Sequence, residues 1–150
     1  MTQQALHYDA VVIIGAPGSG KTYITSELAE ANPNHIVIHT DDYIVFWYEQ
    51  SLYKLLEDLT SEKYKGKKLI IEWVGAYRLL RKWVETDSFY PDCVIEVQTT
   101  ETRLREVYES RGKEPDKVFI MQKGNETVLT KYKALENKHP PVWLYYDNNI

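Results

Sequence analysis

Cysteine is nearly absent from this sequence, and its scarcity limits the chemistry that the chain can perform. Cys93 is the only cysteine among 150 residues, so neither an internal disulfide nor a multi-cysteine metal site can form. The four histidines show no spacing typical of a metal site either. This cysteine usage fits a reducing compartment, and we expect a cytoplasmic protein.

Long apolar runs and a large excess of charge are also missing. No apolar run approaches the ~20 residues that cross a bilayer, and residues 1–9 lack the basic and apolar stretches of a secretory signal. We therefore expect no membrane partner. The formal net charge of −4 argues against tight, non-specific binding along a nucleic-acid duplex, although a local basic cleft is compatible with it.

Strand-like and helix-like patterns alternate along the whole chain. The short apolar runs predicted as strands are residues 10–14, 35–39, 69–71, 93–97 and 142–146. Helical spacing occupies 21–31, 48–59, 76–83, a segment between a cap at Thr99 or Thr100 and a stop at Gly112, and 118–135, where Gly124 can interrupt the helix. This alternation predicts parallel βαβ crossovers in one three-layer α/β domain over residues 1–150.

The strongest motif lies directly after the first predicted strand. Residues 15–22 match G-x-x-x-x-G-K-[ST], and this loop comprises Gly15, Ala16, Pro17, Gly18, Ser19, Gly20, Lys21 and Thr22. Glycines let backbone amides point inward around a phosphate, and the following helix adds free amides and its positive dipole end. Lys21 can reach the β- and γ-phosphates, and Thr22 can ligate Mg²⁺. We therefore expect ATP and Mg²⁺ as ligands.

Two carboxylates follow the second predicted strand. Asp41 and Asp42 lie where ligands bind in open α/β sheets, at the carboxyl ends of the strands. A carboxylate there can accept the proton of an attacking hydroxyl or orient Mg²⁺. The alternative is that one of the two only caps the following helix.

Residues 15–43 resemble the kinase domain of polynucleotide kinases. Both have a G-x-P-G-S-G-K-[ST] loop, then an Asn-Pro pair (Asn32-Pro33), then Asp-Asp-Tyr. The resemblance implies that Asp41 is the general base and that the fold is a kinase-type P-loop NTPase with a mainly parallel five-stranded sheet in the order 2-3-1-4-5. We expect Asp42, the second carboxylate of the pair, to serve the acceptor and the metal. Where that family has an arginine for a 3′-phosphate, this chain has Ile44. The wider group of small P-loop kinases is equally resembled.

The same resemblance extends to later residues. Many small kinases have a polar residue after the third strand and an arginine on the next helix, which implies that Glu72 and Arg78 hold the acceptor. Lid arginines after the fourth strand imply catalytic roles for Arg105 and Arg111. The alternatives are a solvated glutamate with a surface arginine, and an i,i+4 pair of Glu101 with Arg105.

Together these features predict an ATP-dependent kinase. Its acceptor is predicted to be a hydroxyl of a nucleoside, of a nucleic acid (the 5′ end or a modified base) or of a small metabolite. One rival is a nucleoside monophosphate kinase, whose acceptor is a phosphate. The other is a P-loop ATPase or regulatory nucleotide-binding protein without an acceptor.

Overall fold

The computed structural model describes residues 8–16, 18–39, 48–72, 76–87 and 89–148. Helices and strands alternate along the chain as β1 (Ala10–Gly15), α2 (Lys21–Ala31), β2 (Ile36–His39), α3 (Tyr48–Thr60), β3 (Leu69–Glu72), α4 (Ala76–Thr86), β4 (Cys93–Gln98), α5 (Glu101–Ser110), α6 (Pro115–Ala134) and β5 (Val142–Asp147).

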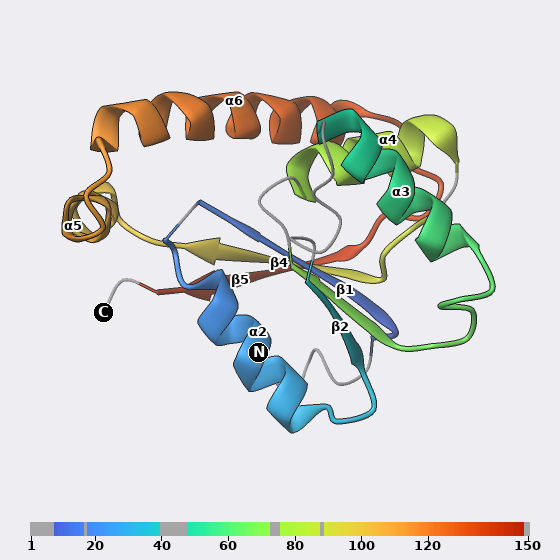
Figure 1. Cartoon of the computed structure of the whole chain (residues 1–150). Coiled ribbons are helices and arrows are strands. Elements are labelled where there is room, and N and C mark those ends of the chain that lie inside the picture. The colour runs from blue at the N-terminus through green and yellow to red at the C-terminus, as the bar shows by residue number, and fades with distance from the viewer. Residues whose placement is uncertain (1–7, 17, 40–47, 73–75, 88, 149–150) are drawn as a thin grey trace.

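The strands form one five-stranded sheet in the order β2-β3-β1-β4-β5, and all four pairings are parallel. This confirms the predicted fold class and strand order. Figure 1 shows α3, α4 and α6 over one face of the sheet and α2 over the other. Because helices cover both faces, every residue of the central strand β1 is buried, which is why this strand is a continuous apolar run.

Alternate residues of β1 enter two separate apolar cores. Val12 and Ile14 pack in a cluster with α3, α4 and α6 that includes the fully buried Trp83. Val11 and Ile13 pack on the opposite face in a cluster with α2. Each large apolar side chain contributes about 1.5–3 kcal/mol when it is fully buried. The end of β1, where the glycine-rich loop begins, is therefore held from both faces.

Helix α5 begins at one of its two candidate caps. The Thr100 side chain accepts a hydrogen bond from the Arg103 backbone N–H at 3.3 Å, and Gly112 follows the helix with a φ of 70°, which favours glycine.

Helix α6 runs through Gly124 without a break, so the interruption considered there does not occur. A helical glycine costs about 1 kcal/mol, and the burial of Leu129 and Tyr132 from the same helix outweighs that cost.

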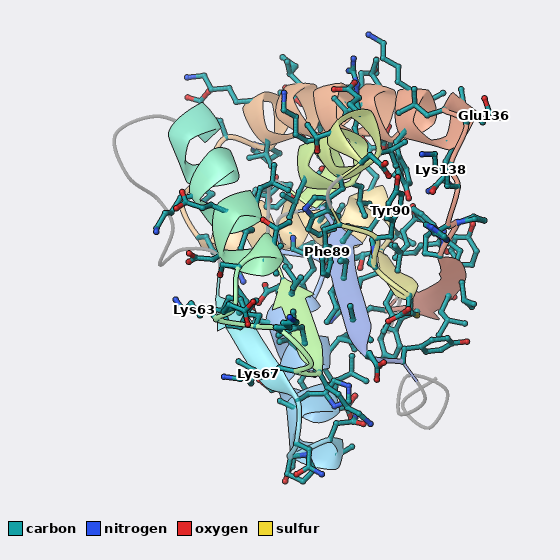
Figure 2. The ribbon with its side chains drawn as sticks, turned by 90° about the vertical axis from the view of Figure 1, so that its right-hand side faces the viewer. Lys63, Lys67, Phe89, Tyr90, Glu136 and Lys138 are labelled. Atoms are coloured by element: carbon teal, nitrogen blue, oxygen red, sulfur yellow. The ribbon has the colours of Figure 1, made fainter. Side chains whose placement is uncertain are left out.

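A polar cluster around Asp87 joins two loops at the amino ends of the strands. Tyr90 Oη donates to Asp87 Oδ1, and Lys138 Nζ donates to Asp87 Oδ2 at 3.3 Å. Figure 2 shows Tyr90 and Lys138 close to each other, with Phe89 nearby. Phe89 packs on Trp83 with ring centroids 4.8 Å apart. These contacts occupy the amino end of the sheet, and the glycine-rich loop lies at the opposite, carboxyl end.

The thiol of the single cysteine and the membrane-spanning capacity of the helices can also be judged from the structure. Cys93 is buried in β4, and burial raises the pKa of its thiol to about 12, so the thiol stays protonated and unreactive at neutral pH. Within the described residues, no helix combines the length and apolar character needed to span a membrane.

Candidate active site

The glycine-rich loop connects β1 to α2, and two of its positions require glycine. A Cβ on Gly15 would lie 2.7 Å from Ser19 Oγ and 3.0 Å from the Val97 carbonyl oxygen. Gly20, directly before α2, has a φ of 103°, and a Cβ there would collide with Asn148 Nδ2. The backbone can take this shape only without side chains at these positions. The loop forms a cradle at the N-terminus of α2, where free amides are available to an anionic ligand.

Lys21 is a buried cation at the base of this cradle. Only 7% of its surface is exposed, and its Nζ donates hydrogen bonds to the carbonyl oxygens of Gly15 at 2.9 Å and Ala16 at 3.0 Å. Burial lowers the pKa of Lys21 to about 8, and the negative charge of Glu72 opposes part of this shift. A buried ammonium held mainly by carbonyl dipoles is incompletely neutralised, so an anionic phosphate beside it would be stabilised.

Ser19 adds a buried hydroxyl that lacks a partner. The residue is 1% exposed, and its Oγ makes no hydrogen bond to any atom of the described residues. Leaving such a group unsatisfied costs about 1–3 kcal/mol. A phosphate oxygen would accept its hydrogen bond. The glycine cradle, the buried ammonium and this hydroxyl together fit the phosphate groups of a nucleoside triphosphate.

Two oxygen-bearing side chains meet beside the cradle. Thr22 Oγ1 donates to Glu72 Oε1 at 3.3 Å. Glu72 ends β3 and is paired in register with Ile13 of β1, which places its carboxylate next to the start of α2. Hydroxyl and carboxylate oxygens are ligands that Mg²⁺ prefers, so Thr22 and Glu72 can hold this ion. No group of three or more histidine, cysteine, aspartate or glutamate side chains suited to a metal occurs in the part of the chain that the structure describes.

Two residues hold the loop from outside, a role that the sequence did not indicate for either of them. Asn148, directly after β5, donates from Nδ2 to the Ser19 carbonyl oxygen at 2.7 Å, and Thr99 Oγ1 donates to the same oxygen at 3.1 Å. A peptide carbonyl and the next amide point in opposite directions, so anchoring this oxygen turns the Gly20 N–H the other way. The two anchors lie 129 and 80 residues from Ser19, and no local pattern marks them.

The two arginines selected by resemblance have different surroundings. Arg111, at the C-terminal end of α5, has Nη1 3.7 Å from the position of a Cβ on Gly18, so its guanidinium lies against the loop. Arg105 forms ion pairs with Glu101 at 3.0 Å and with Asp116 at 3.2 Å. The i,i+4 pair that the sequence offered as an alternative is therefore present. Arg105 joins α5 to α6, whereas Arg111 lies beside the phosphate cradle.

Other predicted site residues are not among those that the structure describes. Pro17, Asp41 and Asp42 lie outside the described residues, and of Arg78 only the backbone, within α4, is described. Their roles stay predictions. The strand before the two aspartates does end in the right region, because His39 of β2 is paired in register with Glu72 of β3.

The sheet order and the loop define the class of fold as a P-loop NTPase of kinase type. No protein-family model matches the sequence, and no curated protein matches it either. Among solved structures, the chain is similar to a gluconokinase from Sinorhizobium meliloti 1021, with a TM-score of 0.53 and 16% identity over 92% of this chain and 81% of that chain. It is also similar to a deoxyadenosine kinase from M. mycoides with bound dATP, with a TM-score of 0.52 and 14% identity over 92% and 90%. At these identities the likeness establishes the P-loop kinase fold, and it does not extend to the finer resemblance to polynucleotide kinases.

The lowered pKa of Lys21 predicts a pH dependence of nucleotide binding. A bound phosphate favours the charged ammonium, so affinity should fall as the pH rises above about 8 and Lys21 loses its proton. For a single titrating group, the dissociation constant should rise roughly tenfold between about pH 8 and 9.5. Calorimetric titration with an unreactive ATP analogue, at constant ionic strength, measures this change.

Lys21→Arg is the matched control because arginine stays charged throughout this range. Its affinity should not depend on pH, and a fall as large as that of the wild type would show that another group titrates. Unfolding does not explain the effect. The pKa of Lys21 in the folded protein lies below 10.5, the ordinary pKa of lysine. Between these two values the unfolded chain binds more protons, so the contribution of Lys21 to the free energy of unfolding rises with pH.

Asn148→Ala should weaken nucleotide binding by loosening the loop. The Ser19 carbonyl oxygen loses its shorter hydrogen bond, and we expect the dissociation constant for ATP to rise about tenfold. Asn137→Ala is the control, because Asn137 Nδ2 bonds Tyr132 Oη at 3.4 Å away from the loop. Equal ATP affinities in the wild type and Asn148→Ala would contradict the anchoring role.

Proposed function

We propose that this protein is an ATP-dependent kinase that uses Mg²⁺ and transfers the γ-phosphoryl group to a hydroxyl. The observation that carries the proposal is the cradle at the end of β1, in which the buried Lys21 ammonium and the unpartnered Ser19 hydroxyl fit phosphate groups. The Thr22–Glu72 oxygen pair beside it supports a magnesium site. The likeness of the fold to solved kinases adds support.

Each of the proposed site residues has a separate role in the transfer reaction. The loop amides and Lys21 orient the β- and γ-phosphates and neutralise their charge. Mg²⁺, when held by Thr22 and Glu72, supplies further positive charge to these phosphates. Asp41 accepts the proton of the acceptor hydroxyl as the hydroxyl oxygen bonds to the γ-phosphorus. The bond from that phosphorus to the bridging oxygen breaks, and ADP leaves with the electron pair.

The acceptor is proposed to be a nucleoside, a nucleic-acid 5′ end or modified base, or a small metabolite. The resemblance of residues 15–43 to polynucleotide kinases supports a nucleic-acid end. The names of the two similar structures, a gluconokinase and a deoxyadenosine kinase, support a smaller acceptor. Asp42 and Arg78 are proposed to hold the acceptor in either case, and Asp42 is a further candidate ligand of Mg²⁺. Glu72, which the resemblance also assigned to the acceptor, is proposed to bind Mg²⁺ instead, because its Oε1 accepts a hydrogen bond from Thr22 Oγ1.

Transfer from γ-labelled ATP tests the function. The wild type should form a labelled phosphomonoester, and Lys21→Ala should reduce the rate at least ~10²-fold because a fixed charge on the phosphates is lost. Circular dichroism confirms that the variant is folded. A phosphoanhydride product would instead identify a nucleoside monophosphate kinase, and release of labelled phosphate without a labelled acceptor would identify a hydrolytic NTPase.

Asp41→Asn in the same assay separates chemistry from binding. Nucleotide affinity should be retained while turnover falls by ~10²-fold or more, as expected for a lost general base. Loss of activity in Asp42→Asn together with full activity in Asp41→Asn would reverse the roles proposed for this pair.

The two arginines form a matched pair for a second test. Arg111→Gln should lower turnover by ~10²-fold or more, because a guanidinium against the loop can stabilise charge on the transferred group. Arg105→Gln removes ion pairs on the surface of α5 and should change turnover less than about threefold. The opposite result would assign the lid role to Arg105.

A further inference from the structure

A cavity of about 880 Å³ lies next to the phosphate cradle. Its wall includes Ala16 of the loop, the carboxyl end of β4, and residues of α5 and α6. Small-molecule sites typically have volumes of about 300–1,000 Å³. Because Ala16 belongs to both the loop and this wall, a molecule in the cavity would lie next to the bound triphosphate.

Two polar side chains of β4 line the cavity where an apolar core would otherwise continue. Residues of β4 alternate between the faces of the sheet, and Val94 lies in the core shared with α6. Glu96 and Gln98 follow at intervals of two residues and face the same side. Gln98 Nε2 donates to Glu96 Oε2 at 3.2 Å. The Glu96 side chain is half-exposed, and Gln98 supplies one of its hydrogen bonds, so the other lone pairs of its carboxylate are open to the hydroxyl groups of a ligand.

Helix α6 contributes both polar and apolar groups to the opposite wall. The polar residues are Gln122, Lys123 and Glu126, and apolar surface comes from Phe119, Ile120 and Leu129. Amide and carboxylate groups bond hydroxyls, and apolar side chains cover the carbon skeleton that carries them. This mixture suits a compact molecule with several hydroxyl groups.

The charge of the lining disfavours anions. Four lining residues carry carboxylates and one carries a positive charge, namely Glu96, Glu101, Asp116 and Glu126 against Lys123. Arg105 pairs with both Glu101 and Asp116, yet the excess of negative charge remains. An anionic acceptor would be repelled by these carboxylates and by the adjacent triphosphate.

We propose that this cavity binds the acceptor, and that the acceptor is an uncharged molecule with several hydroxyls, such as an aldose, a sugar alcohol or a nucleoside. Glu96 and Gln98 bind its hydroxyls, and Glu96 also sets the preference against anions. The hydroxyl nearest Ala16 receives the phosphoryl group. This inference rests on the proposed kinase function.

Two defined pools of acceptors test the charge preference. The first holds ribonucleosides, deoxyribonucleosides, aldoses and sugar alcohols, and the second holds the matching nucleoside monophosphates and aldonates. With γ-labelled ATP, label should enter the first pool at least about tenfold faster than the second, because the anions meet unfavourable charge. Equal or faster labelling of the second pool would overturn the inference.

ATP binding and ATP hydrolysis are measured in parallel. These measurements distinguish failure of the acceptor assignment from failure of the proposed kinase function. A protein that neither binds nor hydrolyses ATP refutes the proposed kinase function and, with it, the assignment of the cavity. A protein that labels neither pool but labels a nucleic-acid 5′ end refutes only the uncharged polyhydroxyl acceptor, whereas hydrolysis of ATP with no labelled acceptor at all refutes the kinase function.

Glu96→Gln tests the residue assignment with the acceptor that is labelled best. Its KM should rise about tenfold, while the affinity for ATP should stay within about twofold, because the carboxylate bonds the acceptor and not the nucleotide. The ratio of anionic to uncharged acceptor labelling should also rise, which a purely structural role would not produce. Glu106→Gln, on the exposed surface of α5, is the control and should change neither quantity. An unchanged KM and an unchanged ratio in folded Glu96→Gln would overturn the assignment.

Discussion

The buried ammonium of Lys21 is the interaction on which the rest of the site depends. Removing a charge from water is costly, and the partners described for it are two backbone carbonyls and the nearby carboxylate of Glu72. The cost is sustained because β1 is packed from both faces and cannot move away from the cation. The same burial that lowers the pKa leaves the ammonium incompletely neutralised, so an anionic phosphate beside it would be stabilised. The lowered pKa and the fit to an anionic phosphate thus share one cause.

The parallel sheet explains how distant residues converge on this cation. In a parallel sheet all carboxyl ends lie at one edge, so the segments after β1, β3, β4 and β5 meet there regardless of their separation along the chain. Glu72 reaches Thr22 from β3, and Thr99 and Asn148 reach the loop from β4 and β5. The amino ends, by contrast, hold packing contacts such as those of Tyr90 and Lys138 with Asp87. One edge of the sheet carries the candidate site, and the other carries packing contacts.

Much of this architecture can be predicted from local sequence, and the rest depends on contacts that leave no local trace. Apolar runs and helical spacing predict every strand and helix that the structure describes, and the loop motif predicts the glycine-rich turn between β1 and α2, because these signals occupy a few adjacent residues. Thr99 and Asn148, which anchor the loop, reach it only because the pairing of β4 and β5 in the sheet brings the residues after these strands to the Ser19 carbonyl. Resemblance could not separate Arg105 from Arg111 either, since ion pairs between α5 and α6 decide which guanidinium is engaged. Gly124 is the opposite case. Its local sequence suggests an interruption of the helix, but packing keeps α6 continuous through this residue.

The anchoring of the loop by Asn148 has a consequence for the order in which the protein is made. The ribosome completes the whole glycine-rich motif early, but the residue that holds the Ser19 carbonyl follows 129 positions later. At about 5–20 residues per second, that interval lasts roughly 6–26 s. During this time β5 is also missing from the side of β4, so the nascent chain contains the motif without the finished cradle. The loop is therefore fully anchored only after Asn148 has been added, and a fragment released before that point should bind a phosphate ligand more weakly than the longer chain.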